Sequence, residues 1–238
     1  MDEVELPRVL AQLWGVEEGR SRPGPKPAFH ISDIARAAVR LADAGGIGAV
    51  SMSKVAAELG FTTMSLYRYI DAKDDLYVVM IEHAFGLPPE LPPEQDWRAR
   101  ITLWAEAFRD GLRAHPWVLH IPVHEPPLSP NQLAWLESAL HAFDGTPLTP
   151  QDRLSAMLLV NIYVRGTTQL TANMATDPDE AREADRRYAE RLTLLATPDR
   201  FPGIAGAFGQ QPPDETDEFS FGLDTVLDGI QARIDRIR

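Results

Sequence analysis

The chain has 238 residues, which is enough for one large or two small domains with a real hydrophobic core. It contains no cysteine, which excludes disulfides and thiolate chemistry, and no run of about 18 apolar residues or signal-peptide pattern occurs. We therefore expect a cytoplasmic protein with no membrane partner. The formal net charge of −12 works against general attraction to nucleic acid, so any contact with DNA must depend on which charges face the duplex.

Residues 1–27 predict a short helix followed by a basic arm. Between residues 4 and 14, apolar side chains recur at helical spacing, so this helix must pack against another part of the chain. The segment SRPGPKP after it is extended, because prolines and a glycine interrupt it, and it contains no acid. Two interpretations stay open: an arm that enters a minor groove or lies along phosphates, and a plain solvated linker. The basic residues concerned are Arg20, Arg22 and Lys26.

A support helix is predicted from residue 31 to the glycine pair Gly45 and Gly46. Its apolar side chains fall on one stripe, which suits a scaffold that other helices cover. The stripe consists of Ile31, Ile34, Ala35, Ala38, Leu41 and Ala42.

Two short helices with a tight turn at Gly60 are predicted next. Ser51 caps the first helix and Thr62 caps the second, and each cap follows an apolar residue at the spacing of a hydrophobic staple. Because the turn is so short, the helices must cross steeply, as in a helix-turn-helix. The second helix buries Leu66 and leaves small, hydroxyl-bearing and aromatic groups suited to base edges, thymine methyls and phosphates. These residues are Thr63, Met64, Ser65, Tyr67 and Tyr69.

Lys73 opens the helix that follows. A lysine on a first turn opposes the helix dipole, which is unfavourable unless its ammonium reaches an anion. A DNA phosphate would supply that anion. The alternative is a lysine that is merely exposed.

The run LGFTTMSLYRYIDAKDDL resembles the signature of the tetracycline-repressor (TetR) family, and the likeness extends over roughly residues 30–80. The resemblance implies an all-helical, dimeric, ligand-responsive transcriptional regulator whose lysine at position 73 binds a phosphate. One position departs from the signature, because Ile70 stands where the family usually carries phenylalanine, and this apolar exchange need only repack. The residues that carry the likeness are Gly60, Leu66, Tyr67 and Lys73.

A domain boundary is predicted at residues 86–95, GLPPELPPEQ, because its four prolines cannot continue a helix. Three later helices each start with a capping residue followed by proline, at Ser129-Pro130, Thr149-Pro150 and Asp177-Pro178.

The second of these helices, expected to reach about Met174, is apolar on almost every side, so its own domain or a partner must cover it. Residues 197–215 predict a loop rich in glycine and proline, and a near-heptad stripe from Phe219 to Ile237 predicts the last helix. We expect these two apolar helices to pair with their partner copies as the four-helix bundle of a homodimer.

A small-molecule site is predicted in the second domain, where aromatic side chains occur with isolated polar groups. For each residue the alternative is plain packing in the core or the dimer interface. Arg165 is the most informative, because a charge within an apolar helix must be paired, or meet a ligand anion or the partner subunit. The candidates are Trp104, Phe108, Trp117, His120, Trp135, Met157, Asn161, Arg165 and Thr168.

No catalytic constellation is found, so we expect no enzyme and no cofactor. His115, His120 and His124 lie close in sequence, but Pro116 and Pro122 break the spacing that would align them on a metal, and we predict none.

The expected fold is therefore all-α. An N-terminal three-helix helix-turn-helix DNA-binding bundle with its connecting helix, residues 28–85, precedes a larger helical ligand-binding and dimerisation domain, residues 96–238. The dimer places its recognition helices about 34–36 Å apart on a near-palindromic operator, where Ser53, Tyr67 and Lys73 hold phosphates. We expect an unknown small molecule to release this repressor from its operator.

Two alternatives stay open. The first is a dimeric DNA-binding protein that senses no small molecule, which close packing of Trp104, Phe108, Met157 and Asn161 without a void would favour. The second is an all-helical enzyme, whose DNA affinity would survive the loss of Tyr67 and Lys73.

Overall fold

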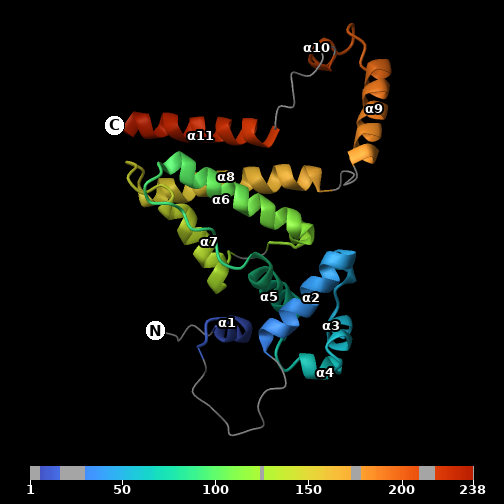
Figure 1. Cartoon of the computed structure of the whole chain (residues 1–238), viewed down its shortest axis with the longest axis vertical. Helices are drawn as coiled ribbons and strands as arrows, with labels where there is room; N and C mark the ends of the chain where they lie inside the picture. The colour runs from blue at the N-terminus through green and yellow to red at the C-terminus, as the bar shows by residue number, and fades with distance from the viewer. Residues whose placement is uncertain (1–5, 17–29, 124–125, 173–177, 209–217, 238) are drawn as a thin grey trace.

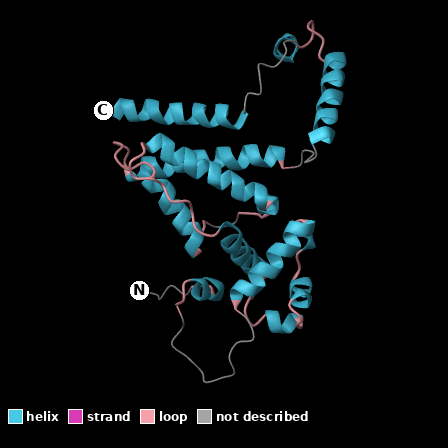
Figure 2. Cartoon of the chain, in the orientation of Figure 1, coloured by secondary structure: helices cyan, strands magenta, loops and turns pink. Residues whose placement is uncertain are grey.

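The computed structural model describes residues 6–16, 30–123, 126–172, 178–208 and 218–237, and every regular element within these ranges is helical (Figure 1, Figure 2). The chain is an all-α protein. Its α-helices are α1 (Arg8–Leu13), α2 (Ile31–Gly45), α3 (Met52–Glu58), α4 (Thr63–Leu66), α5 (Lys73–Phe85), α6 (Trp97–Ala114), α7 (Pro130–His141), α8 (Pro150–Thr171), α9 (Pro178–Leu195), α10 (Pro202–Phe208) and α11 (Glu218–Ile237). Two short 3-10 helices, η1 (Ile47–Ala49) and η2 (Pro116–His120), lie between them.

The helix-turn-helix predicted from the sequence is present in α3 and α4. The hydroxyl of Ser51 accepts the N–H of Lys54 and that of Thr62 accepts the N–H of Ser65, each at 3.3 Å, so both predicted caps are confirmed. Gly60 between the helices has a φ of +75°, a left-handed backbone conformation that favours glycine. Local sequence therefore sets the geometry of this turn.

The core of the N-terminal bundle lies where α2 crosses α5, with α3 and α4 beside α2 (Figure 1). Ile70 is completely buried here, so packing absorbs the exchange of phenylalanine for isoleucine at this position. Other side chains with no exposed surface in this core are Ile34, Val55, Leu76 and Met80.

The N-terminal helix α1 is shorter than the stretch of residues 4–14 that the sequence predicts. Pro7 precedes it, and Gly15 follows its end with a left-handed φ of +64°. Only part of its apolar stripe is covered by the core: Val9 and Leu10 are buried, whereas Leu6 and Trp14 are exposed.

In the second half of the chain, α6, α7, α8 and α11 pack together, and α8 contacts each of the other three. Its predicted start is confirmed, because the hydroxyl of Thr149 accepts the N–H of Asp152 at 3.1 Å. The helix ends at Thr171, before the predicted end near Met174, which lies outside the described residues. One side of α8 remains exposed although it is apolar, and it carries Leu154, Leu158, Leu159, Ile162 and Leu170.

Two local predictions for this half are wrong. Residues 197–215 are not a continuous loop, since α10 forms within them, and residues 209–217 lie outside the described ranges. Ser129 directly precedes α7, so the predicted helix start is confirmed, but its hydroxyl accepts no backbone N–H of that helix. The hydroxyl donates to the carboxylate of Glu82 at 2.6 Å and to the side-chain oxygen of Gln132. The N–H of Asn131, on the first turn of α7, donates instead to the carboxylate of Glu82 at 2.9 Å, so a distant acceptor replaces the local cap.

α9 starts at Pro178 as predicted, and with α10 it stands away from the other helices (Figure 1). The capping residue expected before it, Asp177, lies outside the described residues. Among the helices that the structure describes, none is long and apolar enough to cross a membrane.

Candidate DNA-binding surface and effector site

The predicted recognition helix is α4, and two of its side chains project into solvent. Met64 is 75% exposed and Tyr67, at the end of the helix, is 43% exposed. Thr63 and Ser65 are half-buried. The hydroxyl of Ser65 lies 3.0 Å from that of Thr62, so it takes part in the helix cap. Met64 and Tyr67 therefore form the outermost part of this surface.

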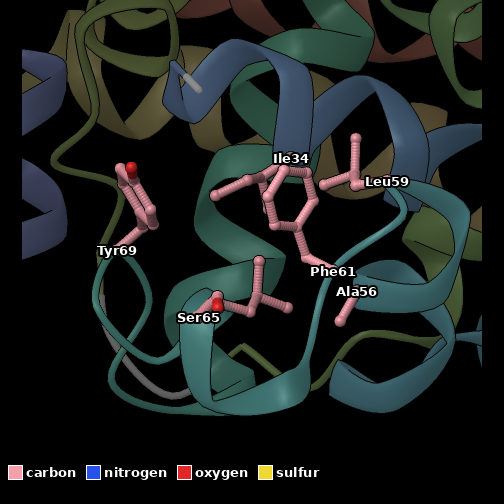
Figure 3. Close-up of a pocket in the computed structure, with 7 residues that line it drawn as sticks. Ile34, Ala56, Leu59, Phe61, Ser65 and Tyr69 are labelled. Carbon is pink, nitrogen blue, oxygen red and sulfur yellow. The ribbon is translucent and has the colours of Figure 1, made fainter. Parts of the chain in front are cut away.

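Tyr69 does not have the outward orientation that the sequence predicts. It follows α4, is half-buried and packs against the core of the bundle. With Ile34, Leu59 and Phe61, among others, it lines a gap of about 10 Å³ (Figure 3). Such a volume holds no more than one water molecule. The gap is a packing defect beside α4, and the half-buried Tyr69 lines one side of it.

Ser53 and Lys73 are both exposed, as a contact with phosphate requires. The ammonium of Lys73 lies 5.5 Å from the centre of the Tyr77 ring. The first turn of α5 also holds Asp74 and Asp75, whose negative charges suit the helix dipole. The two acids compensate for the unfavourable interaction of the lysine with the helix dipole, and the ammonium stays exposed.

The cations of the N-terminal bundle fall into two groups. On α2, Arg36 pairs with Asp33 at 3.7 Å and Arg40 pairs with Glu58 at 3.3 Å. Within the described ranges, no ion pair is found for the other group, which lies on α3, on the turn after α4 and at the start of α5. An acidic chain thus keeps unneutralised positive charge beside its recognition helix. This second group consists of Lys54, Arg68 and Lys73.

Arg68 is a candidate that the sequence reasoning missed, although its position directly after Tyr67 could have indicated it. The predicted basic arm, Arg20, Arg22 and Lys26, lies outside the described residues.

Four aromatic rings form a close-packed cluster where α5 meets α6 and α7. Trp104, Phe108 and Trp135 are predicted ligand residues that the fold brings together, and Phe85, at the end of α5, joins them. Neighbouring ring centres lie 5.2 to 5.9 Å apart. The indole N–H of Trp104 donates to the carbonyl of Trp135 at 3.0 Å, and that of Trp135 donates to the carbonyl of Gly86 at 3.1 Å. The four rings therefore pack against one another, and both indole N–H groups are satisfied by backbone carbonyls.

On α8, Met157 and Thr168 are buried, and the hydroxyl of Thr168 donates to the carbonyl of Val164 at 2.7 Å. Asn161 and Arg165 are half-buried. Burial lowers the pKa of the Arg165 guanidinium, and no acid pairs with it in the part of the chain that the structure describes. A half-buried cation without a counter-ion is suited to an anionic group from outside the domain.

A second cation of this half, Arg109 of α6, was missed by the sequence reasoning. Its guanidinium carbon lies 3.8 Å from the centre of the Phe219 ring at the start of α11. Its buried Nε finds no hydrogen-bond partner within the described ranges. No local pattern marks this arginine, because the ring that it contacts is far along the chain.

Two further predicted ligand residues lie apart from the aromatic cluster. The indole N–H of Trp117 donates to the carboxylate of Asp43 at 2.7 Å, and Nδ1 of His115 lies 2.8 Å from the same oxygen. Since Asp43 belongs to α2, these contacts join η2 to the N-terminal bundle. His120, at the end of η2, is exposed.

A second joint connects α5 with the start of α7. The carboxylate of Glu82 is buried and accepts the hydroxyl of Ser129 at 2.6 Å and the N–H of Asn131 at 2.9 Å. The side-chain amide of Asn131 donates to the carbonyl of Glu82 at 3.0 Å. The N-terminus of α7 favours the negative charge held there. Movement of α7 therefore acts directly on α5.

Comparison with known proteins identifies both halves of the chain. Residues 34–80 match the profile of the bacterial regulatory proteins of the tetR family, and residues 88–234 match that of the tetracyclin repressor-like C-terminal domain. The HTH-type transcriptional repressor DrrR1 of Streptomyces coeruleorubidus is 32% identical over 237 residues, which cover 97% of this chain and 87% of the relative. An HTH-type transcriptional regulator of Saccharopolyspora erythraea is 30% identical over 223 residues, covering 92% and 91%.

Solved structures with the same fold include ActR of Streptomyces coelicolor. Its apo form has a TM-score of 0.75 at 21% identity and covers 90% of this chain and all of that one, 100%. Its complex with actinorhodin has a TM-score of 0.74 at 21% identity and covers 86% and 96%.

Proposed function

The chain belongs to the tetracycline-repressor (TetR) family of bacterial regulatory proteins, and we propose that it acts as a homodimer on a near-palindromic DNA operator. It is a ligand-responsive, DNA-binding transcriptional repressor. One observation carries the proposed DNA contact: Met64 and Tyr67 project from α4 among cations for which no ion pair is found in the described ranges.

Within this surface, Thr63 and Met64 face base edges, where methyl and thioether groups suit thymine methyls. Ser53, Tyr67 and Lys73 hold phosphates, and Arg68 adds a further charge. Because the whole chain is acidic, with a formal net charge of −12, affinity depends on these few cations. Operator binding is therefore specific and sensitive to salt, and nonspecific binding is weak.

The exposed side of α8 supports the homodimer. Leu158 and Ile162 are 52% and 58% exposed, one helical turn apart, on a helix that already packs on α11. An apolar stripe of this length on a single chain needs a cover, and a second copy of α8 and α11 supplies one of matching chemistry. Two-fold symmetry then sets the two copies of α4 about 34–36 Å apart, the spacing of successive major grooves.

For the effector, we propose an aromatic molecule with an anionic group. The rings of Trp104, Phe108 and Trp135 suit a planar apolar body, Asn161 offers a hydrogen bond, and Arg165 offers an unpaired charge. The ActR protein, which shares the fold, has been solved in complex with actinorhodin. Because the aromatic cluster is closed here, the effector must prefer a conformation in which these rings separate.

Close packing of Trp104 on Phe108, with ring centres 5.2 Å apart, is the observation that favours the alternative of a domain that only dimerises. The relatives by sequence are transcriptional regulators, which weighs against the enzyme alternative.

Operator binding is tested with DNA from the region upstream of the gene, by fluorescence anisotropy of labelled fragments. The double variant Tyr67→Ala, Lys73→Ala should bind roughly 700-fold more weakly, because a dimer loses four contacts of roughly 1 kcal/mol each. The dependence of log K on log salt should become shallower by about 2, for two lysine–phosphate contacts.

The matched control is Tyr188→Ala, Arg191→Ala, which removes an exposed tyrosine and an exposed cation from α9. It should bind as the wild type does. Equal DNA affinity of all three proteins would exclude α4 as the DNA-binding helix.

A further inference from the structure

We propose that α1 and the residues beside it, 6–16, form a strap that holds the recognition helix and ties it to the effector domain, with Arg8 as the positioning residue. This inference rests on the proposed function of α4 in operator binding. The strap lies outside both segments that match the family profiles, 34–80 and 88–234. Its role therefore has to be read from its own contacts.

At one end of the strap, Arg8 binds the turn that follows the recognition helix. Nη2 of Arg8 donates to the carbonyl of Tyr67 at 3.0 Å and to the carboxylate of Asp71 at 2.6 Å. Tyr67 is the residue at which α4 ends, so its carbonyl belongs to the negative end of that helix. A guanidinium at this place satisfies the carbonyl and favours the dipole.

Outside support matters for α4 because the helix has only four residues. A single turn fixes several backbone angles for very few internal hydrogen bonds, so it is unstable by itself. The hydroxyl of Thr62 fixes its start, and Arg8 fixes its end. Both DNA-facing side chains, Met64 and Tyr67, lie between these two points.

The body of the strap is anchored in the core. Val9 and Leu10 are 3% and 6% exposed, and α1 packs on α5, the helix that connects the bundle to the effector domain. Arg8 therefore extends from a fixed base. A bond from a fixed base holds its partner in place, whereas a mobile arginine would move with it.

The other end of the strap reaches the effector domain. The indole N–H of Trp14 donates to the carbonyl of Leu128 at 2.9 Å. Leu128 directly precedes Ser129, whose hydroxyl bonds to Glu82 where α7 begins. Any shift of this segment relative to the bundle pulls on Trp14, and through α1 on Arg8 and the end of α4.

The first test measures amide hydrogen exchange of the full chain without DNA or effector. Arg8→Met should raise the exchange rate of amides 62–71 about threefold, the loss expected for an exposed ion pair. Trp14→Phe keeps an aromatic ring but removes the indole N–H, and it should also raise the exchange rate of amides 62–71. The control is Trp97→Phe, which removes the bond from Trp97 to Gln231, at 3.2 Å, in the effector domain.

The control should leave amides 62–71 unchanged. If Trp14→Phe also leaves them unchanged while Arg8→Met raises them, the link to the effector domain is overturned. If neither variant raises them, the strap as a whole is overturned. Because DNA is absent, these outcomes do not depend on the proposed function.

The second test measures operator affinity. The direction of the change in affinity distinguishes a positioning role of Arg8 from simple attraction between its charge and phosphates. If Arg8 only attracted phosphates, Asp71→Asn would strengthen binding, since it removes a negative charge. A positioning role predicts that Arg8→Met and Asp71→Asn each weaken binding, by about threefold per subunit and about tenfold in a dimer.

The salt dependence of binding by Arg8→Met should stay that of the wild type, because no phosphate contact is lost. Arg113→Met, an exposed arginine of α6, is the control for charge and should bind normally. Stronger binding by Asp71→Asn overturns the positioning role of Arg8. Absence of operator binding by the wild type would instead overturn the proposed function and leave the exchange result standing.

Discussion

The buried carboxylate of Glu82, on α5, accepts the hydroxyl of Ser129 at 2.6 Å, where α7 begins. It also accepts the N–H of Asn131, and no cation pairs with it among the described residues. The helix that connects the DNA-binding bundle to the effector domain is thus held to α7 by bonds to a single charged group. These bonds are suited to transmit a movement of α7 to α5.

We expect Glu82→Gln to weaken this joint strongly. A glutamine keeps one oxygen for the N–H of Asn131, but its amide nitrogen cannot accept the hydroxyl of Ser129 and the negative charge is lost. Hydrogen bonds to charged groups contribute about 1.5–3 kcal/mol. The free energy of unfolding by urea should fall by about 2 kcal/mol. The control Glu90→Gln, at an exposed position of the proline-rich linker, should be neutral. If Glu82→Gln unfolds with the same free energy as the wild type, the bonds of the Glu82 carboxylate do not stabilise the contact between α5 and α7.

For Arg165, replacement by methionine should stabilise the unliganded protein by about 1 kcal/mol, because a half-buried cation without an ion pair is removed. The same variant should bind the aromatic anion anilinonaphthalene sulfonate about tenfold more weakly in a fluorescence titration. Binding of the uncharged phenylnaphthylamine should not change. Equal losses for both probes would show that Arg165 acts through packing and not through charge.

At the proposed dimer interface, Leu158→Glu and Ile162→Glu should each produce monomers. Each buried side chain contributes about 1.5–3 kcal/mol, and two-fold symmetry counts each substitution twice. The measurement is molar mass by light scattering after size-exclusion chromatography. Leu87→Glu, at a leucine of the linker that is 75% exposed, is the control. Should both α8 variants remain dimeric, another surface must join the subunits.

The stability of the protein should depend on pH through a contact between α8 and α11. Hydrogen bonds from Thr149 and Arg233 lower the pKa of Asp152, whose carboxylate lies 2.6 Å from Nη2 of Arg233. A lowered pKa in the folded state means that this contact stabilises the protein above the usual pKa of an aspartate and is lost as the pH falls through the folded value.

The difference in Tm between the wild type and Asp152→Asn should therefore be largest above about pH 5 and should shrink as the pH falls below the usual aspartate pKa of about 4. Asp185→Asn, at an exposed position of α9, should show no such trend. A difference that grows as the pH falls would contradict the assignment.

Helix starts and the tight turn were predictable because their causes lie within a few residues of one another. Ser51, Thr62 and Thr149 each accept a backbone N–H three residues further along the chain. The exposed apolar side of α8 also followed from composition, since a helix without a polar face must be covered. The loop predicted at 197–215 was wrong, because glycine and proline content did not exclude a short helix that starts at Pro202.

The chain's own sequence determined its all-helical class, its helix-turn-helix and its family, because capping, helical periodicity and the signature are local patterns. Only the tertiary structure decided that Ser129 bonds to Glu82 and does not cap α7, that Tyr69 packs inward, and that Arg8 reaches the end of α4. These contacts join residues 47 and 59 positions apart, or depend on which face of the bundle is covered. No periodicity encodes such a choice, since it is made by the packing of whole helices against one another.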